Sequence, residues 1–251
     1  MTARVVVVTG ASGGVGRGIA IACGAVGWHV WIAARREGEG QAVAAEVDRA
    51  GGRGRFVSCD AALPSSMASA VAAVVEEEGR LDGFVHNATS GLSPRPVRLA
   101  DVSTADLLDH IAVSVRGSFL AARAAYPHLV ASQGALLLLT SEAGIEGKSR
   151  LAPYAAVKAA QRGMVRALAR EWGRAGVRVN AIAPLASSPA MERAFEADPA
   201  MEPRVLGRNP LGRLGDPVAD IGAVARYLLS EDSAYVTGHT IPADGGSCAL
   251  T

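Results

Sequence analysis

Apolar and polar positions along the chain alternate between short β-branched runs and longer, alanine-rich stretches with helical spacing. This alternation is typical of parallel strands joined by helical crossovers. It predicts strands at 4–9, 29–34, 55–60, 83–87, 135–141, 177–183 and 239–243. It predicts helices at 16–26, 37–50, 65–78, 104–132, 153–174 and 217–229, the fourth being either two helices or one long, bent helix.

The unbroken leucine run at 136–139 suits a strand that is covered on both faces of a parallel sheet. Seven strands suffice for one doubly wound α/β sheet. No internal repeat or low-complexity linker interrupts the order, so we expect one domain over residues 1–251.

The segment 184–213 breaks this rhythm with five prolines spread among apolar residues. Loops of this length in compact domains are usually functional or disordered. Because the segment follows the carboxyl end of a strand, where open α/β sheets bind ligands, it predicts a substrate lid at about 185–213. The alternative is a surface excursion with one loose helix.

The composition, with 49% hydrophobic and 20% charged residues, is that of a soluble globular chain. A net charge of +1 argues against nucleic acid or an anionic membrane as a partner. The three cysteines, at 23, 59 and 248, lack the spacing of a disulfide framework or a zinc site, so we expect no metal and a reduced, cytoplasmic location. The first residues predict no signal peptide, and no apolar run approaches the length of a membrane span.

A glycine-rich turn follows the first predicted strand and precedes the first predicted helix. Glycines at 10, 14 and 16 would let the backbone turn tightly and approach a pyrophosphate, which the exposed amides of a helix N-terminus favour. Glycine spacing alone is weak evidence, since the chain has 29 glycines. The strand, turn, helix and second strand in this order favour dinucleotide binding over a merely tight turn.

The end of the second predicted strand indicates which nicotinamide cofactor binds. An acidic residue there would hold the ribose 2′-hydroxyl, whereas an arginine accommodates a 2′-phosphate. The strand continues into Arg35 and Arg36, and the first acidic residue is Glu37. We therefore expect NADP(H), with NAD(H) as the alternative; solvated surface arginines are the simpler explanation.

Tyr154 and Lys158 lie four residues apart, just after Pro153, and so project from one face of a predicted helix. A nearby ammonium stabilises a phenolate and lowers the phenol pKa, which would let the pair exchange a proton with a substrate oxygen. Such pairs are more often surface residues. However, Lys148 and Lys158 are the only lysines among 25 basic residues, so we infer that position 158 needs a compact ammonium whose pKa the surroundings can shift.

Ser141 closes the predicted strand 135–141, at the end of the sheet where ligands bind. Its hydroxyl could hydrogen-bond a substrate carbonyl and stabilise negative charge on oxygen. Thr140 could do the same, and a turn or capping role is the alternative for Ser141.

Five motifs that occur in this order resemble those of the short-chain dehydrogenase/reductase family. They are Gly10-x-x-x-Gly14-x-Gly16, Asn87-Ala88, Ser141, Tyr154-x-x-x-Lys158 and Asn180-Ala-Ile-Ala-Pro184. The resemblance extends from Val5 to about Ser247. Any one motif is only moderately specific, but the ordered set is strong.

The resemblance implies a Rossmann-type, mostly parallel seven-stranded sheet with helices on both faces, in a homotetramer or homodimer. It implies that Tyr154 is the acid/base, that Lys158 lowers the Tyr154 pKa and holds the nicotinamide ribose, and that Ser141 orients the substrate. It also implies that Asp60 meets the adenine and that Pro184 begins the stretch facing the nicotinamide.

Taken together, the motifs and the resemblance give three sets of site residues. The cofactor-binding set is Gly10, Ser12, Gly13, Gly14, Val15, Gly16, Arg35, Arg36, Asp60, Ala61, Asn87, Ala88, Tyr154, Lys158, Pro184 and Leu185. The catalytic set is Ser114, Ser141, Tyr154 and Lys158, and the substrate set is Ser141, Glu142, Tyr154 and Met191.

The chain departs from the family pattern at three places. Ser114 stands where many members have an asparagine that steadies a water in a proton relay. The run from His86 to Thr89 replaces the usual Asn-Asn-Ala-Gly, and Leu185 replaces a glycine after Pro184.

Three functions remain open. The first is an NADPH-dependent ketone reductase or secondary-alcohol dehydrogenase acting on a small molecule. The second is a catalytically weak nucleotide-binding protein that acts by association. The third is a reductase of 3-oxoacyl thioesters, for which Arg193, Arg204 and Arg208 in the predicted lid would attract an acidic carrier or a coenzyme A phosphate.

Overall fold

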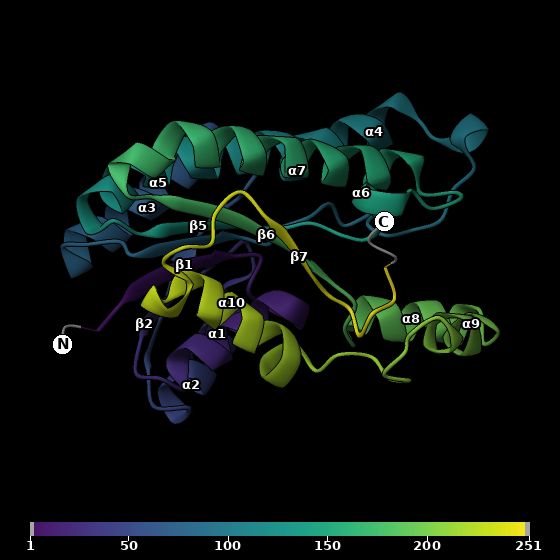
Figure 1. The fold of residues 1–251 in the computed structure, drawn as a ribbon, viewed down its shortest axis with the longest axis horizontal. Helices are drawn as coiled ribbons and strands as arrows, with labels where there is room; N and C mark the ends of the chain where they lie inside the picture. Colours follow the sequence, from purple (N-terminus) through teal and green to yellow (C-terminus); the bar gives the residue numbers. More distant parts are fainter. Residues whose placement is uncertain (1–2, 249–251) are drawn as a thin grey trace.

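Seven parallel strands form one sheet in the computed structural model, which describes residues 3–248 except the side chains of residues 190, 194 and 197 (Figure 1). The strands are β1 (Val5–Thr9), β2 (His29–Ala34), β3 (Arg53–Ser58), β4 (Gly83–His86), β5 (Ala135–Leu139), β6 (Arg178–Pro184) and β7 (Thr240–Ala243). Their order is β3-β2-β1-β4-β5-β6-β7, and every adjacent pair is parallel. The strand order reverses between β1 and β4, and this is where open α/β sheets bind ligands. The doubly wound, Rossmann-type prediction is confirmed.

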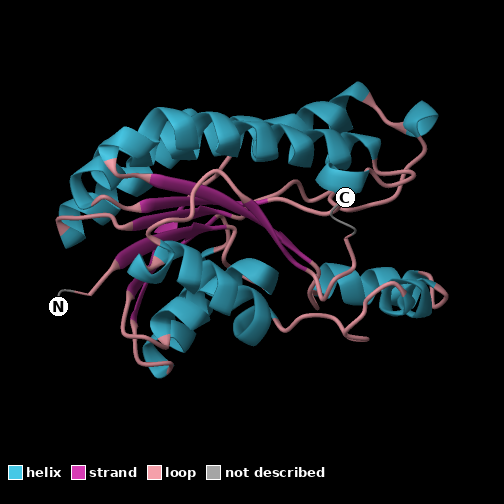
Figure 2. Ribbon diagram, viewed as in Figure 1, coloured by secondary structure: helices cyan, strands magenta, loops and turns pink. Residues whose placement is uncertain are grey.

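Helices cover both faces of the sheet (Figure 2). One face carries α3 (Pro64–Glu78), α4 (Thr104–His110), α5 (Gly117–Ser132) and α7 (Ala152–Trp172). The other carries α1 (Gly14–Gly24), α2 (Glu37–Arg49) and α10 (Ala223–Leu229). The remaining helices are α6 (Ala143–Glu146), α8 (Pro189–Ala197) and α9 (Met201–Gly207), with short segments η1 (Leu99–Asp101), η2 (Ile111–Arg116), η3 (Gly173–Ala175), η4 (Pro217–Gly222) and η5 (Glu231–Ser233).

The predicted helix 104–132 is two α-helices joined by the π-helical segment η2. The amide of Gly117 donates to the carbonyl of Ala112, five residues earlier, which is the spacing of a π turn. Segments of this kind are frequent at functional sites. Here η2 carries Ser114 into the protein interior, where its side chain is fully buried.

The central strand β5 is at most 3% exposed along its whole length, as the leucine run predicted. It is shorter than predicted, since it ends at Leu139 and not at residue 141. Thr140 still follows the sheet, because its amide donates to the carbonyl of Ile182 at 2.8 Å. Ser141 lies beyond the sheet, at the carboxyl end of β5.

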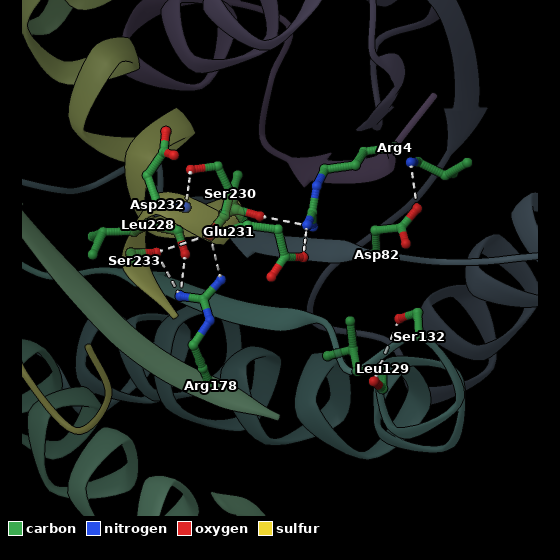
Figure 3. Close-up of polar contacts among 12 residues, drawn as sticks. Arg4, Asp82, Leu129, Ser132, Arg178, Leu228, Ser230, Glu231, Asp232 and Ser233 are labelled. Carbon is green, nitrogen blue, oxygen red and sulfur yellow. Dashed lines mark hydrogen bonds and ion pairs between the residues drawn. The ribbon is translucent and has the colours of Figure 1, made fainter. Parts of the chain in front are cut away.

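Polar contacts join the opposite, amino end of the sheet to the last turn of α10 and the segment after it (Figure 3). The Arg178 guanidinium donates to the carbonyls of Leu228 at 2.7 Å and Ser230 at 3.0 Å, and to the Ser233 hydroxyl at 2.7 Å. Arg4, just before β1, reaches the same segment through Glu231. These contacts stabilise the sheet at its amino end, far from the carboxyl ends of the strands, which face ligands.

Candidate active site

A cavity of about 1190 Å³ lies along the carboxyl ends of the strands. Its walls come from the segments that follow all seven strands and from α7, α8 and α9. All but two of the site residues expected from the sequence line it. Those lining it are Gly10, Ser12, Gly13, Gly14, Val15, Arg35, Arg36, Asp60, Ala61, Asn87, Ala88, Ser141, Glu142, Tyr154, Lys158, Pro184, Leu185 and Met191. Gly16 and Ser114 do not line the cavity but pack behind its wall.

The glycine turn between β1 and α1 approaches its neighbours too closely for side chains. Gly10 has a φ of 64°, and a Cβ added to it would lie 2.8 Å from the Cα of Ala88. A Cβ on Gly16 would lie 2.5 Å from Nδ2 of Asn87. Gly13, in contrast, is open, since an added Cβ would meet no atom within 4 Å.

The N-terminus of α1 has no side-chain cap, and Gly13 and Gly14 at this end of the helix line the cavity. Uncapped amides at a helix start favour a negatively charged group. The open position at Gly13, the uncapped helix and the cavity volume of about 1190 Å³ therefore fit a dinucleotide.

The end of β2 places two arginines at the cavity. Nη2 of Arg36 donates to the Ser12 hydroxyl at 3.2 Å, and its Nη1 lies 3.0 Å from the Glu39 carboxylate. Arg35 makes no ion pair with another described residue. Asp60 lines the same region, and its Oδ1 accepts a hydrogen bond from the amide of Ala62 at 2.9 Å.

Tyr154, Lys158 and Ser141 meet at the carboxyl end of β5. Nζ of Lys158 donates to the carbonyl of Leu139 at 2.7 Å and lies 5.7 Å from the Tyr154 ring centroid. Ser141 is close enough to Tyr154 for its side chain to lower the phenol pKa, and its hydroxyl accepts a hydrogen bond from the amide of Ala143 at 3.2 Å. Thr140 is directed elsewhere, because its hydroxyl donates to the carbonyl of Ile182 at 3.1 Å. The structure therefore favours Ser141 over Thr140 as the hydroxyl next to the tyrosine.

Burial sets the charge states of this group. Desolvation raises the pKa of Tyr154, partly offset by the Ser141 side chain, and Glu142 raises it further. The net shift of the Tyr154 pKa is therefore opposite in direction to the one expected from a nearby ammonium, because desolvation is its largest cause. Burial also lowers the pKa of Lys158, which is only 3% exposed, to about 7. The lysine is thus poised between its two protonation states near neutral pH.

The predicted lid holds two short helices, α8 and α9, where the sequence suggested an irregular loop or one loose helix. Figure 1 shows them beyond the carboxyl ends of β6 and β7. Side chains from this segment line the cavity, namely Met191, Arg193, Met201, Arg204, Val205 and Arg208. Arg208 at the end of α9 pairs with Glu146 of α6 at 3.2 Å, and Glu146 also pairs with Lys148 at 3.4 Å. These ion pairs tie the segment to the loop that follows Ser141.

Comparison with known proteins places this site in a family. The family model described as enoyl-(acyl carrier protein) reductase, adh_short_C2, matches residues 10–248. The chain is 31% identical over 253 residues to 2,5-dichloro-2,5-cyclohexadiene-1,4-diol dehydrogenase of Sphingobium indicum, covering 100% of this chain and 99% of that protein. It belongs to the short-chain dehydrogenase/reductase family. The chain is therefore an oxidoreductase that acts on alcohol or carbonyl groups with a nicotinamide cofactor.

Solved structures of short-chain dehydrogenases share the whole fold. A putative short-chain alcohol dehydrogenase from Sinorhizobium meliloti superposes with a TM-score of 0.93 at 35% identity, covering 100% of this chain and 98% of that one. The 3-ketoacyl-(acyl-carrier-protein) reductase from Brucella melitensis, complexed with NADH, has a TM-score of 0.89 at 28% identity and covers 98% of both chains.

Behind the cavity, this short-chain dehydrogenase carries a buried polar cluster that the sequence indicated only in part. The Ser114 hydroxyl and Oε1 of Gln161 are buried without a hydrogen-bond partner among the described residues. Nε2 of Gln161 donates to the Ser118 hydroxyl at 2.8 Å and to the Ser114 carbonyl at 3.3 Å. Sequence reasoning missed Gln161, although it follows Lys158 by three residues and so lies on the same helical face.

Two further observations bear on partners. No helix in residues 3–248 is long and apolar enough to cross a membrane. Within the same residues, no group of histidine, cysteine, aspartate or glutamate side chains is arranged to hold a metal ion.

Proposed function

We propose that this chain is an NADP(H)-dependent oxidoreductase that interconverts a ketone and a secondary alcohol, with Tyr154 as the acid/base. The observation that carries the proposal is the meeting of Tyr154, Ser141 and Lys158 at one strand end, in the cavity that also contains the glycine cradle. Proton transfer and cofactor binding therefore share one site.

The bound cofactor would supply or accept the hydride. The raised pKa of Tyr154 keeps its hydroxyl protonated at neutral pH, so it can donate a proton to a carbonyl oxygen. Ser141 can hydrogen-bond the same oxygen while negative charge develops on it. Lys158 donates a hydrogen bond to the Leu139 carbonyl, and when its amine is protonated the positive charge stabilises the Tyr154 phenolate that forms after proton transfer. This arrangement favours reduction of a ketone at neutral pH.

The preference for NADP(H) rests on the end of β2. Ala34, Arg35 and Arg36 form the cavity wall there, and none of these three residues carries a carboxylate that would hold a ribose 2′-hydroxyl; the nearby Asp60 comes from the segment after β3. Arg35 is without an ion pair to another described residue and could pair with a 2′-phosphate. NAD(H) is the alternative, since the related Brucella melitensis reductase is complexed with NADH.

Residues 185–213, with α8 and α9, are proposed to form the substrate lid of one domain spanning the chain. Met191, Met201 and Val205 line the cavity, which suits a substrate that is hydrophobic in part. The second candidate substrate class is a 3-oxoacyl thioester, because Arg193 also lines the cavity and makes no ion pair with another described residue. Arg204 and Arg208 favour it less, since Asp198 and Glu146 already pair with them.

We also propose a cytoplasmic homotetramer or homodimer. Apolar side chains are exposed along α4, η2 and α5, among them Leu108 and Phe119, which are 57% and 52% exposed. Exposed apolar residues that gather on one face indicate a protein interface. Light scattering of the purified protein tests this, and a monomer at micromolar concentration would contradict it.

The experiment that tests the proposed function is a substrate screen with NADPH and NADH run side by side, over simple ketones and acetoacetyl thioesters. We expect carbonyl-dependent oxidation of NADPH with at least one ketone and a weaker reaction with NADH. Clear NADPH binding without any carbonyl-dependent oxidation would instead favour a nucleotide-binding protein that acts by association.

A further inference from the structure

His86, the last residue of β4, is completely buried beneath the site. Its Nδ1 lies 3.1 Å from the Thr9 hydroxyl at the end of β1, and its Nε2 lies 3.1 Å from the Val113 carbonyl in η2. The ring therefore bridges the sheet and the π-helical segment. Gly117 leaves room for it, since a Cβ added there would lie 2.9 Å from Cε1 of His86.

The hydrogen bonds around the ring determine which nitrogen carries the proton. A carbonyl can only accept, so Nε2 must donate to Val113. The Thr9 hydroxyl accepts from the amides of Asn87 at 3.1 Å and Ala88 at 3.2 Å, which fills both of its acceptor positions. Its one proton can then go to Nδ1 of His86, whereas the other acceptor in range, the Val85 carbonyl, lies farther away at 3.5 Å.

His86 is thus neutral, with its proton on Nε2, and every polar atom of the Thr9 and His86 side chains is used. Burial and the nearby Lys158 lower the His86 pKa to about 4, which agrees with this state. A second proton on the ring would turn Nδ1 into a donor and break the contact with Thr9 as it stands.

The two ends of this bridge lead to two different parts of the site. On the Thr9 side are the amides of Asn87 and Ala88, whose residues line the cavity next to the glycine turn. On the other side, Val113 precedes Ser114, whose carbonyl accepts from Gln161 of α7. The segment η2, which carries Ser114, is therefore hydrogen-bonded to β4 on one side and to α7, the helix of Tyr154 and Lys158, on the other.

We propose that His86 is a positioning residue. Through Nδ1 and the Thr9 hydroxyl it fixes the loop after β4, which lines the cavity with Asn87 and Ala88. Through Nε2 and the Val113 carbonyl it fixes η2, the segment that carries Ser114. This inference rests on the proposed function of the site. It assigns a role to a position where the sequence pattern shows only a departure from the usual asparagine.

Two variants separate the two contacts. In His86→Asn the side-chain amide reaches about as far as Nδ1, so the contact with Thr9 can persist and the contact with Val113 is lost. In His86→Gln the amide reaches as far as Nε2, so the contact with Val113 can persist and the one with Thr9 is lost. His128 on α5, which is half-buried, provides matched controls when it is changed to Asn and to Gln.

We expect His86→Asn to lower kcat by about tenfold, the upper range for one neutral hydrogen bond, with the NADPH dissociation constant within about twofold of wild type. We expect His86→Gln to raise the NADPH dissociation constant by about five- to tenfold, with kcat at saturating cofactor within about twofold. If His86 had only a structural role, both variants would have a lower melting temperature, but kcat would not fall selectively in His86→Asn and NADPH binding would not weaken selectively in His86→Gln. Equal changes of both constants in the two variants, or no change in either, would overturn the proposal.

NMR of the wild-type protein labelled with ¹⁵N-histidine tests the bridge independently of activity. The His86 ring should show the neutral Nε2–H form, unchanged from pH 8 to pH 5. A proton on Nδ1 would overturn the inference even in an active enzyme. If the protein reduces no carbonyl while the ring shows the expected form and His86→Gln still weakens NADPH binding, the proposed function fails and the bridge stands.

Discussion

Replacing Lys158 with methionine removes a buried ammonium and changes how stability depends on pH. Burial lowers the Lys158 pKa from 10.5 to about 7 in the folded protein. Between these two values the unfolded chain binds more protons than the folded one, so the free energy of unfolding rises with pH in this window. Below about pH 7 both states carry the proton, and the full cost of burying the charge opposes folding.

The size of the effect follows from the depression of the pKa. At about 1.4 kcal/mol per pKa unit, the full cost is about 5 kcal/mol. From pH 7 to pH 9, this linkage makes the wild-type free energy of unfolding rise by about 2 kcal/mol relative to Lys158→Met. The variant also loses the hydrogen bond to the Leu139 carbonyl, which both the charged and the neutral amine can donate, so the comparison rests on the slope with pH and not on the absolute free energy.

Equilibrium urea unfolding without cofactor, at equal protein concentrations and at pH 6, 7, 8 and 9, measures this difference. The matched control is Lys148→Met, since Lys148 is the only other lysine and is ion-paired with Glu142 and Glu146 at the cavity. We expect the control to keep the wild-type rise. Parallel curves for wild type and Lys158→Met from pH 7 to pH 9 would refute the reasoning, because they would mean that burial does not perturb the lysine.

Four other substitutions have distinct expected results. Arg35→Ser should weaken NADPH binding by about tenfold or more and leave NADH within about twofold, as measured by fluorescence titration, because only NADPH carries the 2′-phosphate; equal losses for both cofactors would contradict the assignment. Gly16→Ala should abolish cofactor binding, because the added Cβ would clash with Asn87. Gly163→Ala should raise the free energy of unfolding by up to about 1 kcal/mol, because no atom lies within 4 Å of the added Cβ and alanine favours the helix. Arg178→Met should lower the free energy of unfolding by about 2–4 kcal/mol, measured by urea unfolding, with kcat of the folded enzyme unchanged; a loss of kcat would show that the amino end of the sheet reaches the site.

The order of strands and helices could be predicted because it depends on local periodicity. Hydrophobic runs at β1 and β5 are long enough to mark buried parallel strands, and glycines mark the turn into α1. The sequence extended β5 through Ser141, because a threonine and a serine after four leucines do not mark where a strand ends. The chain leaves the sheet there, which places the Ser141 hydroxyl next to Tyr154.

The polar layer behind the site could not be predicted, since it depends on contacts between distant segments. His86 and Val113 are 27 residues apart, and no local pattern indicates that a π turn will bring their atoms within 3.1 Å. The direction of the Tyr154 pKa shift differs from the expected one for a similar reason. Helical spacing shows that a lysine lies nearby, but desolvation depends on how the whole fold encloses the phenol.

The central claim is that Tyr154 exchanges the proton with the substrate oxygen. The most direct test is steady-state reduction of the best ketone from the screen by Tyr154→Phe, with NADPH binding measured on the same sample. Tyr126→Phe is the control, since that ring packs against Trp172 with its centroid at 4.6 Å and does not line the cavity. The account predicts that kcat falls by about 100-fold or more in Tyr154→Phe, with the NADPH dissociation constant within about twofold of wild type and the control unchanged. A Tyr154→Phe enzyme with a kcat near that of wild type would contradict it.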